Sequence, residues 1–157
     1  MKFYATVAIV LLMAVFASFS DDKNHPSISP LNGKAAHNIS GDYGMWVHPI
    51  LAVKRMHEGV DFKIDTGTAV LATAEGKVIW VGSHKDGFGL SLKLQHKADI
   101  TTFYCHLSRC VVKKGEKVRQ GQLIAYSGNT GLSTAPHLHY GVFKNAKSVD
   151  PKEFLPK

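Results

Sequence analysis

Short apolar runs separated by glycine constrain the fold of this chain more than any other feature of its sequence. From Gly41 onward, runs rich in valine, isoleucine and aromatic residues are divided by polar segments that contain glycine. This pattern predicts many short β-strands, most clearly at 76–82, 90–95 and 100–107. Tight turns are expected where glycine permits the required backbone angles, at 85–87, 114–116 and 127–129. We therefore predict an all-β fold, a compact antiparallel sandwich or partly open barrel of short strands.

The first forty residues have a different composition from the rest. Residues 1–20 carry a single charge, Lys2, before an apolar run that ends in small residues, which is typical of an export signal. An uncleaved membrane anchor is the alternative, because the run approaches the roughly 20 residues that a spanning helix needs. Residues 21–40 are polar, contain two prolines and indicate a flexible leader. The remaining part, 41–157, is long enough for one domain with its own core.

The chain stays basic after removal of the predicted signal. Residues 1–20 contain Lys2 and no acid, so 18 lysine and arginine residues remain against 12 aspartate and glutamate residues, a net charge of +6. A basic exported domain suits an anionic surface such as a cell wall. The charges are scattered rather than interleaved with aromatic residues, so we expect no nucleic-acid partner. We expect a monomer without stable membrane insertion, located in the periplasm, the cell envelope or the extracellular space.

Two cysteines, Cys105 and Cys110, would lie in a compartment where a disulfide can persist. Four residues separate them, enough to close a small loop, but a sequence does not determine whether the bond forms. A thiolate metal site is disfavoured, because no second cysteine pair completes it.

Two histidines flank a single leucine in STAPHLHYGV, residues 133–142. On a strand, alternate side chains share a face, so His137 and His139 would point the same way with Cα atoms about 6.5 to 7 Å apart. Both imidazoles would then enter one small volume. The motif is short, and a pair of ordinary surface histidines is the alternative interpretation.

A second polar motif, MHEGVDF, spans residues 56–62. On a continuous strand, His57 and Asp61 would lie about 13 Å apart, too far to share a metal ion. Gly59 allows a bend that brings them together, whereas Val60 and Phe62 disfavour a helix. Two histidines and one carboxylate form a known catalytic zinc set that leaves a fourth position for water. Asp61 alone could equally be a turn residue, so the combination carries the prediction.

A third motif, FYCHL at 103–107, is predicted to place His106 within a strand, with Tyr104 on the same face. A single strand histidine is more often structural than catalytic, and this motif alone does not decide between the two.

Taken together, these stretches resemble the lysostaphin-type zinc endopeptidases, the LytM-like peptidoglycan hydrolases. The matching segments are H-x-G-x-D at 57–61, GTAVLATAEGKV at 67–78, YCHLS at 104–108, VVKKGEKVRQGQLIAYSGNTG at 111–131 and STAPHLHY at 133–140. The resemblance covers about residues 41 to 155, and the shared order of these segments makes it specific.

The resemblance implies a Zn²⁺ cofactor held by His57, Asp61 and His139. It also implies that His106 and His137 assist the reaction without binding the ion. The expected function is therefore a secreted zinc metalloendopeptidase that hydrolyses cross-links or stem peptides of bacterial peptidoglycan. The alternative is a non-hydrolytic LytM-like domain that regulates another wall hydrolase, although such relatives typically lack zinc ligands.

Three further points stay open in the sequence. GEKVRQGQLIAY also resembles the hairpin of biotinyl and lipoyl carrier domains, which suggests a related barrel-sandwich hybrid, but the turn at 127–130 lacks the lysine that a carrier needs. Trp46 and Leu90 stand where the family usually has other residues, so the family's substrate preference cannot be transferred directly to this chain. Asn32 or His37 of the leader could cap the zinc in a latent form.

Overall fold

The fold is built from short strands, as the glycine-divided pattern predicted. In a computed structural model of the chain, residues 23–33, 38–97 and 99–157 are described. Their strands are β1 (Ile39–Gly41), β2 (Gly44–Val47), β3 (Lys54–His57), β4 (Val60–Lys63), β5 (Ala69–Leu71), β6 (Gly76–His84), β7 (Gly89–Gln95), β8 (Ile100–Cys105), β9 (Leu107–Cys110), β10 (Lys117–Val118), β11 (Leu123–Ser127), β12 (His137–Lys144) and β13 (Lys147–Val149). A single 3-10 turn, η3 (Pro151–Glu153), follows them in this part of the chain. The all-β prediction is confirmed.

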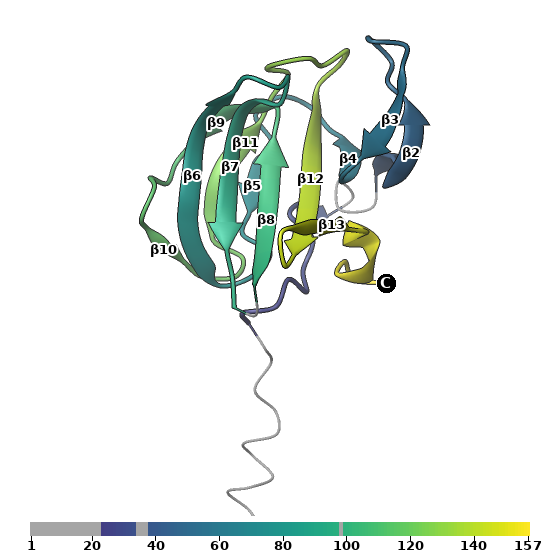
Figure 1. The fold of residues 1–157 in the computed structure, drawn as a ribbon. Coiled ribbons are helices and arrows are strands. Elements are labelled where there is room, and N and C mark those ends of the chain that lie inside the picture. The colour runs from purple at the N-terminus through teal and green to yellow at the C-terminus, as the bar shows by residue number, and fades with distance from the viewer. Residues whose placement is uncertain (1–22, 34–37, 98) are drawn as a thin grey trace, which may run out of the picture.

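The strands form three antiparallel sheets. The largest has the order β1-β4-β12-β8-β7-β6-β10, with β13 paired to β12. A three-stranded sheet, β5-β11-β9, lies behind β6, β7 and β8 in Figure 1. The third sheet is the β2–β3 hairpin, which stands beside the upper end of β12.

The core fills the space between the two larger sheets. Strand alternation sends one face of each strand inward, so Leu92 and Leu94 of β7 are fully buried. They join one apolar cluster with Val70 of β5 and Ile124 of β11. The β12 strand is buried along most of its length, which makes its register the main link between core and functional site.

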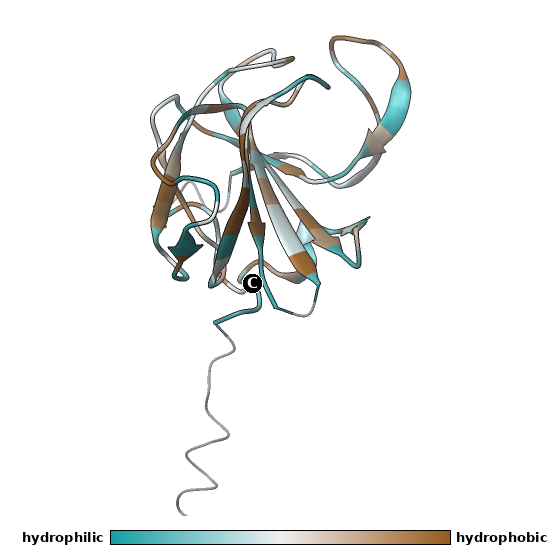
Figure 2. Cartoon of the chain, turned by 60° about the vertical axis from the view of Figure 1, so that its left-hand side comes forward, coloured by the Kyte–Doolittle hydropathy of each residue, from teal (hydrophilic) through white to brown (hydrophobic). Residues whose placement is uncertain are grey.

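The β2–β3 hairpin is more exposed than the main body. Val47 is 64% exposed and Val53 is 51% exposed, and Ile50 and Leu51 at the tip are also exposed. Figure 2 shows this apolar tip in brown, curving away from the large sheet.

Part of the predicted leader packs against the domain. Leu31 is 2% exposed and belongs to the core, and the Leu71 amide donates to the Pro30 carbonyl over 2.9 Å. Further on, Ile39–Gly41 pairs with β4 as an edge strand. Residues 23–33 and 38–40 therefore pack against the domain instead of forming the flexible leader expected over 21–40, and Pro26 and Pro30 are buried there together with Leu31. The predicted signal, residues 1–20, lies outside the described residues.

The predicted third strand is interrupted. The structure ends β8 at Cys105 and begins β9 at Leu107, and His106 between them has a φ of 58°. A strand cannot continue through this left-handed conformation, so the placement of His106 within a strand is wrong.

Two of the three predicted turns have the expected glycine geometry. Gly87 and Gly115 have φ values of 92° and 95°. Gly128 does not have a positive φ and instead forms a bridge with His137, while Gly131, with φ 78°, turns the chain further on.

The disulfide that the sequence left open is not formed. Cys105 and Cys110 are both free thiols. Burial raises the pKa of Cys105 well above its usual value and raises that of Cys110 to about 11. Both side chains are therefore neutral and unreactive at neutral pH.

Within the residues that the structure describes, no helix has the length and apolar character needed to span a membrane.

Candidate metal centre

A cleft opens between the β2–β3 hairpin and two loops at the same end of the large sheet. Its volume is about 280 Å³. One wall comes from the hairpin and includes Trp46 and Arg55, and the opposite wall comes from residues 86–88 and 132–136. The floor holds every site residue predicted from the sequence, namely His57, Asp61, His106, His137 and His139.

Three of these side chains converge on one point. His57 ends β3, while Asp61 of β4 and His139 of β12 are direct partners across the sheet. His139 Nδ1 lies 2.9 Å from Asp61 Oδ1, and His57 Nε2 lies 3.2 Å from the same oxygen and 3.0 Å from His139 Nδ1. One ligand atom from each residue lies within 4.8 Å of the other two. The three side chains, here called the metal-ligand triad, are all buried.

Gly59 contributes to this convergence by its missing side chain. The chain does leave one sheet and enter another here, between His57 of β3 and Val60 of β4. However, Gly59 is not among the residues with positive φ. A Cβ on Gly59 would lie 2.7 Å from the His139 ring and 2.6 Å from the Tyr140 carbonyl oxygen, too close for any other residue. The motif therefore needs glycine for close approach.

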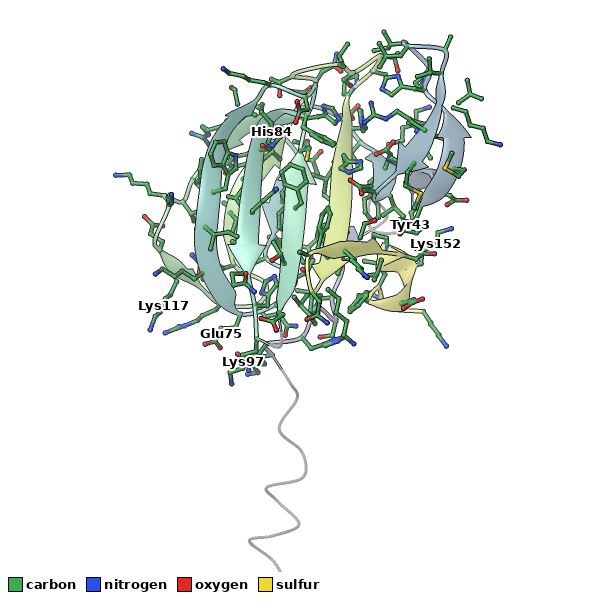
Figure 3. The ribbon with its side chains drawn as sticks, in the orientation of Figure 1. Tyr43, Glu75, His84, Lys97, Lys117 and Lys152 are labelled. Carbon is green, nitrogen blue, oxygen red and sulfur yellow. The ribbon has the colours of Figure 1, made fainter. Side chains whose placement is uncertain are left out.

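A backbone carbonyl fixes the orientation of His57. Its Nδ1 donates to the Asp42 carbonyl oxygen over 2.7 Å, so Nε2 is the nitrogen directed at the triad. The segment carrying this carbonyl is tied to the C-terminal part of the chain. Tyr43 Oη donates to the Ser148 carbonyl over 3.0 Å, and Lys152 Nζ lies 2.6 Å from Asp42 Oδ1. Figure 3 labels Tyr43 and Lys152 next to each other at this junction.

The triad groups share protons through short contacts. Burial opposes the charge of Asp61, but hydrogen bonds from His139 and His57 outweigh it and hold the pKa of Asp61 well below its usual value. Burial also opposes charge on His57, yet its bonds to Asp61 raise the pKa of His57. At His139 burial dominates and lowers the pKa despite the bond to Asp61. The cluster thus contains an anion and at least one neutral imidazole.

His106 is held beside the triad in a strained conformation. Its Nδ1 donates to the Thr130 carbonyl over 2.7 Å, which leaves Nε2 unprotonated in the neutral ring. Burial lowers the pKa of His106 to about 4, so the imidazole is neutral at physiological pH. A positive φ at a non-glycine residue costs of order 1 to 3 kcal/mol and persists only where the surroundings impose it.

His137 completes the row of imidazoles. Its ring centroid lies 4.4 Å from that of His106, and its Nε2 lies 3.9 Å from Asp61 Oδ1. Its Nδ1 lies 2.8 Å from the Ala135 carbonyl oxygen, and donation of this hydrogen bond leaves the lone pair of the neutral ring on Nε2. His137 and His139 share a face of β12, as the strand alternation predicted.

The two positions that depart from the family pattern behave differently. Trp46 stacks on His57, with ring centroids 4.6 Å apart and planes inclined by 25°. Leu90 packs against the core, and its amide donates to Thr130 Oγ1 over 3.0 Å. Only Trp46 lines the cleft. Of the leader residues expected to cap the metal, Asn32 is exposed and does not line the cleft, and His37 lies outside the described residues.

Sequence reasoning missed the carbonyl groups of Asp42 and Thr130. Both act through the backbone, so their residue types carry no signal, and only the fold brings them to the imidazoles. The contact of Trp46 with His57 was also missed, although the strand pairing of Gly44 with His57 puts Trp46 within reach.

The donor set fits a zinc ion. Two imidazole nitrogens and one carboxylate oxygen are a common catalytic zinc set, and the hydrogen bond behind His57 is the usual support for such a ligand. Without a cation, the buried carboxylate of Asp61 would be balanced only by the protons of the neighbouring imidazoles. A divalent cation relieves this arrangement better than any uncharged ligand.

Comparison with protein families identifies the same segment. Residues 55–151 match Peptidase family M23. This segment contains all five predicted site residues.

Curated relatives agree with the match. An uncharacterized metalloprotease of Haemophilus influenzae is 45% identical over 104 residues, which cover 66% of this chain and 22% of the relative. The DD-carboxypeptidase/endopeptidase Mpg of Neisseria meningitidis serogroup B is 40% identical over 72% of this chain and 26% of its own length. Lysostaphin of Staphylococcus simulans is 39% identical over 76% of this chain and 25% of its own length. The chain thus spans about a quarter of the length of these relatives.

Solved structures extend the comparison to the fold. The catalytic domain of lysostaphin from S. simulans aligns with a TM-score of 0.68 at 38% identity, covering 74% of this chain and 90% of that domain. A zinc-containing peptidase from Vibrio cholerae aligns with the same TM-score at 34% identity, covering 81% of this chain and 38% of that one.

Proposed function

The chain belongs to Peptidase family M23, the lysostaphin-type metallopeptidases, and from this premise we propose that it is a zinc endopeptidase that hydrolyses peptide bonds of bacterial peptidoglycan. The observation that carries the proposal is the convergence of His57, Asp61 and His139 at the floor of a cleft. The relatives named as a glycyl-glycine endopeptidase and as a DD-carboxypeptidase/endopeptidase support the substrate class.

The metal-ligand triad would hold Zn²⁺, which when bound would supply Lewis acidity toward the scissile carbonyl and a lowered pKa for the attacking water. The Asp42 carbonyl keeps His57 in the tautomer that presents Nε2. Trp46 covers the outer face of the His57 ring and limits its rotation.

His106 and His137 supply the remaining groups. Each has its Nδ1 committed to a carbonyl oxygen, so each directs Nε2 into the cleft, where the neutral form of the ring accepts a hydrogen bond. Such a group can take a proton from the attacking water and later return it to the leaving amine. Once protonated, the same nitrogen donates a hydrogen bond to a developing oxyanion. The 4.4 Å between the two rings allows both to contact one tetrahedral centre.

We further propose that residues 1–20 direct export and that the domain acts as a monomer on the cell wall. These statements rest on the sequence pattern, because residues 1–22 lie outside the described part of the chain.

The test is release of soluble fragments from purified cell walls by the zinc-loaded protein. We expect release that stops with a chelator and returns with added zinc, and Asp61→Asn serves as the inactive control. A domain that only regulates another hydrolase would bind walls and release nothing. Absence of release by the zinc-loaded wild type would overturn the proposal in favour of that alternative.

A further inference from the structure

Each of two ligand-bearing strands also carries a cation on the face of its ligand. In β3, Arg55 lies two residues before His57, and in β4, Lys63 lies two residues after Asp61. Residues two apart on a strand share a face, with Cα atoms about 6.5 to 7 Å apart. Both Arg55 and Lys63 line the cleft.

Strand pairing fixes the positions of both cations relative to the reactive groups. Arg55 is the direct partner of Trp46, whose ring stacks on His57. Lys63 is the direct partner of His137 on β12. The two cations therefore border the triad from the hairpin side and from the sheet side.

Neither cation is neutralised by the protein. Arg55 and Lys63 are both exposed, and among the described residues neither forms an ion pair. Two exposed acids also line the cleft, but Glu58 pairs with neither cation, and Asp86 lies on the opposite rim, 3.4 Å from His84 Nδ1. Unpaired surface cations are common. These two differ because both lie beside the proposed reaction centre.

From this placement we propose that Arg55 and Lys63 bind a substrate carboxylate next to the scissile bond. The preferred substrates are then peptide stems and cross-links that keep a free carboxylate at this position, rather than neutral oligoglycine bridges. This inference rests on the proposed hydrolase function and deepens it.

The chemistry of the two side chains suits this role. The guanidinium of Arg55 can bind a carboxylate through two parallel hydrogen bonds, and Lys63 adds a point charge. Neighbouring residues of a peptide lie about 3.8 Å apart at their Cα atoms, so a carboxylate on the residue beside the scissile bond stays within the cleft. An oligoglycine bridge has no charge with which to contact either cation.

The test compares three synthetic substrates with the zinc-loaded chain. Two are cross-linked muropeptide dimers in which the diaminopimelate carboxylate beside the cross-link is free or amidated, and the third is pentaglycine. We expect kcat/KM for the free-carboxylate dimer to exceed that for the amidated dimer by roughly tenfold, mainly through KM. Arg55→Gln should abolish this preference, and Lys63→Gln should reduce it about threefold, with one zinc retained per chain in both variants.

A matched control comes from the neighbouring residue. Lys54 lies next to Arg55 on the opposite face of β3 and does not line the cleft, so Lys54→Gln should leave the preference unchanged. Equal kcat/KM for the free and amidated dimers, or faster cleavage of pentaglycine, would overturn the inference while leaving the hydrolase function intact. Failure to cleave any of the three would overturn the hydrolase function itself, and with it this inference.

Discussion

Two clusters of buried polar side chains lie in this small domain, and they are built on opposite principles. The first is the metal-ligand triad of His57, Asp61 and His139. The second, here called the hydroxyl network, consists of Thr73, Thr102, Tyr104 and Tyr140 with His96 at its end.

The hydroxyl network is neutral and extends as a chain. Tyr140 Oη donates to Thr73 Oγ1 over 2.9 Å, and the Thr73 amide donates to Tyr104 Oη over 3.2 Å. Thr102 Oγ1 lies 3.1 Å from Tyr104 Oη and 2.8 Å from His96 Nε2. The chain ends where His96 Nδ1 donates to the Glu75 carbonyl.

The triad has the opposite arrangement, because its lone pairs converge on one point. The three atoms directed at this point, His57 Nε2, His139 Nδ1 and Asp61 Oδ1, satisfy one another only by sharing protons. Burial of a polar group costs free energy unless a hydrogen-bond partner or a counter-charge replaces water. The two clusters differ in what replaces the water. The hydroxyl network is complete within the protein, whereas in the proposed function an external cation completes the triad. The difference separates a stabilising cluster from a functional one.

Two adjacent residues of β12 belong to different clusters, His139 to the triad and Tyr140 to the hydroxyl network. His139 faces the cleft and Tyr140 faces the core, because successive side chains of β12 alternate. Single substitutions can therefore test the two clusters independently.

The largest expected effect is loss of activity on metal removal. Treatment of the protein with a chelator should reduce wall hydrolysis more than about a thousandfold, because the metal supplies several kcal/mol of transition-state stabilisation. The near-UV circular dichroism of the core tyrosines should persist, since no residue of the hydroxyl network is a ligand. Addition of zinc should restore activity. Hydrolysis that survives chelation would remove the distinction between the clusters.

The next effect concerns His106, which borders the triad without belonging to it. His106→Asn should lower kcat by about 10² to 10⁴, the usual contribution of a positioned acid or base. Asparagine tolerates the left-handed backbone, so the loop should keep its shape. Zinc content, measured by mass spectrometry, should stay at one per chain. A zinc-free variant would move His106 into the ligand set.

A substitution in the hydroxyl network should affect stability alone. Tyr104→Phe removes the phenol oxygen that accepts from the Thr73 amide and the Thr102 hydroxyl. These two buried donors lose a partner, so the free energy of unfolding should fall by about 2 kcal/mol. Urea denaturation of the zinc-free protein measures this effect. Zinc content and kcat should not change, and a loss of either would mean that the two clusters are coupled.

The smallest effect is a pH dependence from His96. Burial lowers the pKa of His96 in the folded chain, whereas the unfolded chain has the ordinary value of about 6.5. Below that pH, His96 is protonated in the unfolded chain but stays neutral in the folded chain. The contribution of His96 to the free energy of unfolding is therefore fully present above about pH 6.5 and falls toward pH 5. His96→Gln should flatten this slope. Both proteins are compared without zinc, so that titration of the triad contributes equally, and identical slopes would contradict the assignment.

The residues of the metal-ligand triad can be predicted from the sequence, whereas those of the hydroxyl network cannot. The residue types of the short motifs indicate a metal site, and strand alternation puts His137 and His139 on one face. The resemblance to lysostaphin-type enzymes then selects His139, rather than His137, as the ligand. Threonine and tyrosine are ordinary strand residues, so nothing marks Thr73, Thr102, Tyr104 and Tyr140 as partners. Their contacts depend on how β8 and β12 pair and on how Thr73 packs against them.

The break at His106 and the docking of Leu31, which local sequence did not predict, have the same origin. The all-β class followed from glycine-divided apolar runs, but the break at His106 is imposed by contacts of the folded chain, the Thr130 carbonyl among them. Leu31 docks in the core although it lies in a mainly polar segment, because burial depends on surfaces that are distant in sequence. Local pattern predicts elements, whereas register and long-range packing decide which side chains meet.

The most direct test of the central claim is the zinc content of three purified variants, measured by mass spectrometry against the wild type. Asp61→Asn and His139→Ala should each retain less than about a tenth of a zinc ion per chain, because loss of one ligand or of its charge removes most of the affinity. Tyr140→Phe, one residue from His139 but in the other cluster, should retain one ion. Stoichiometric zinc in both triad variants would contradict the claim that these side chains hold the metal.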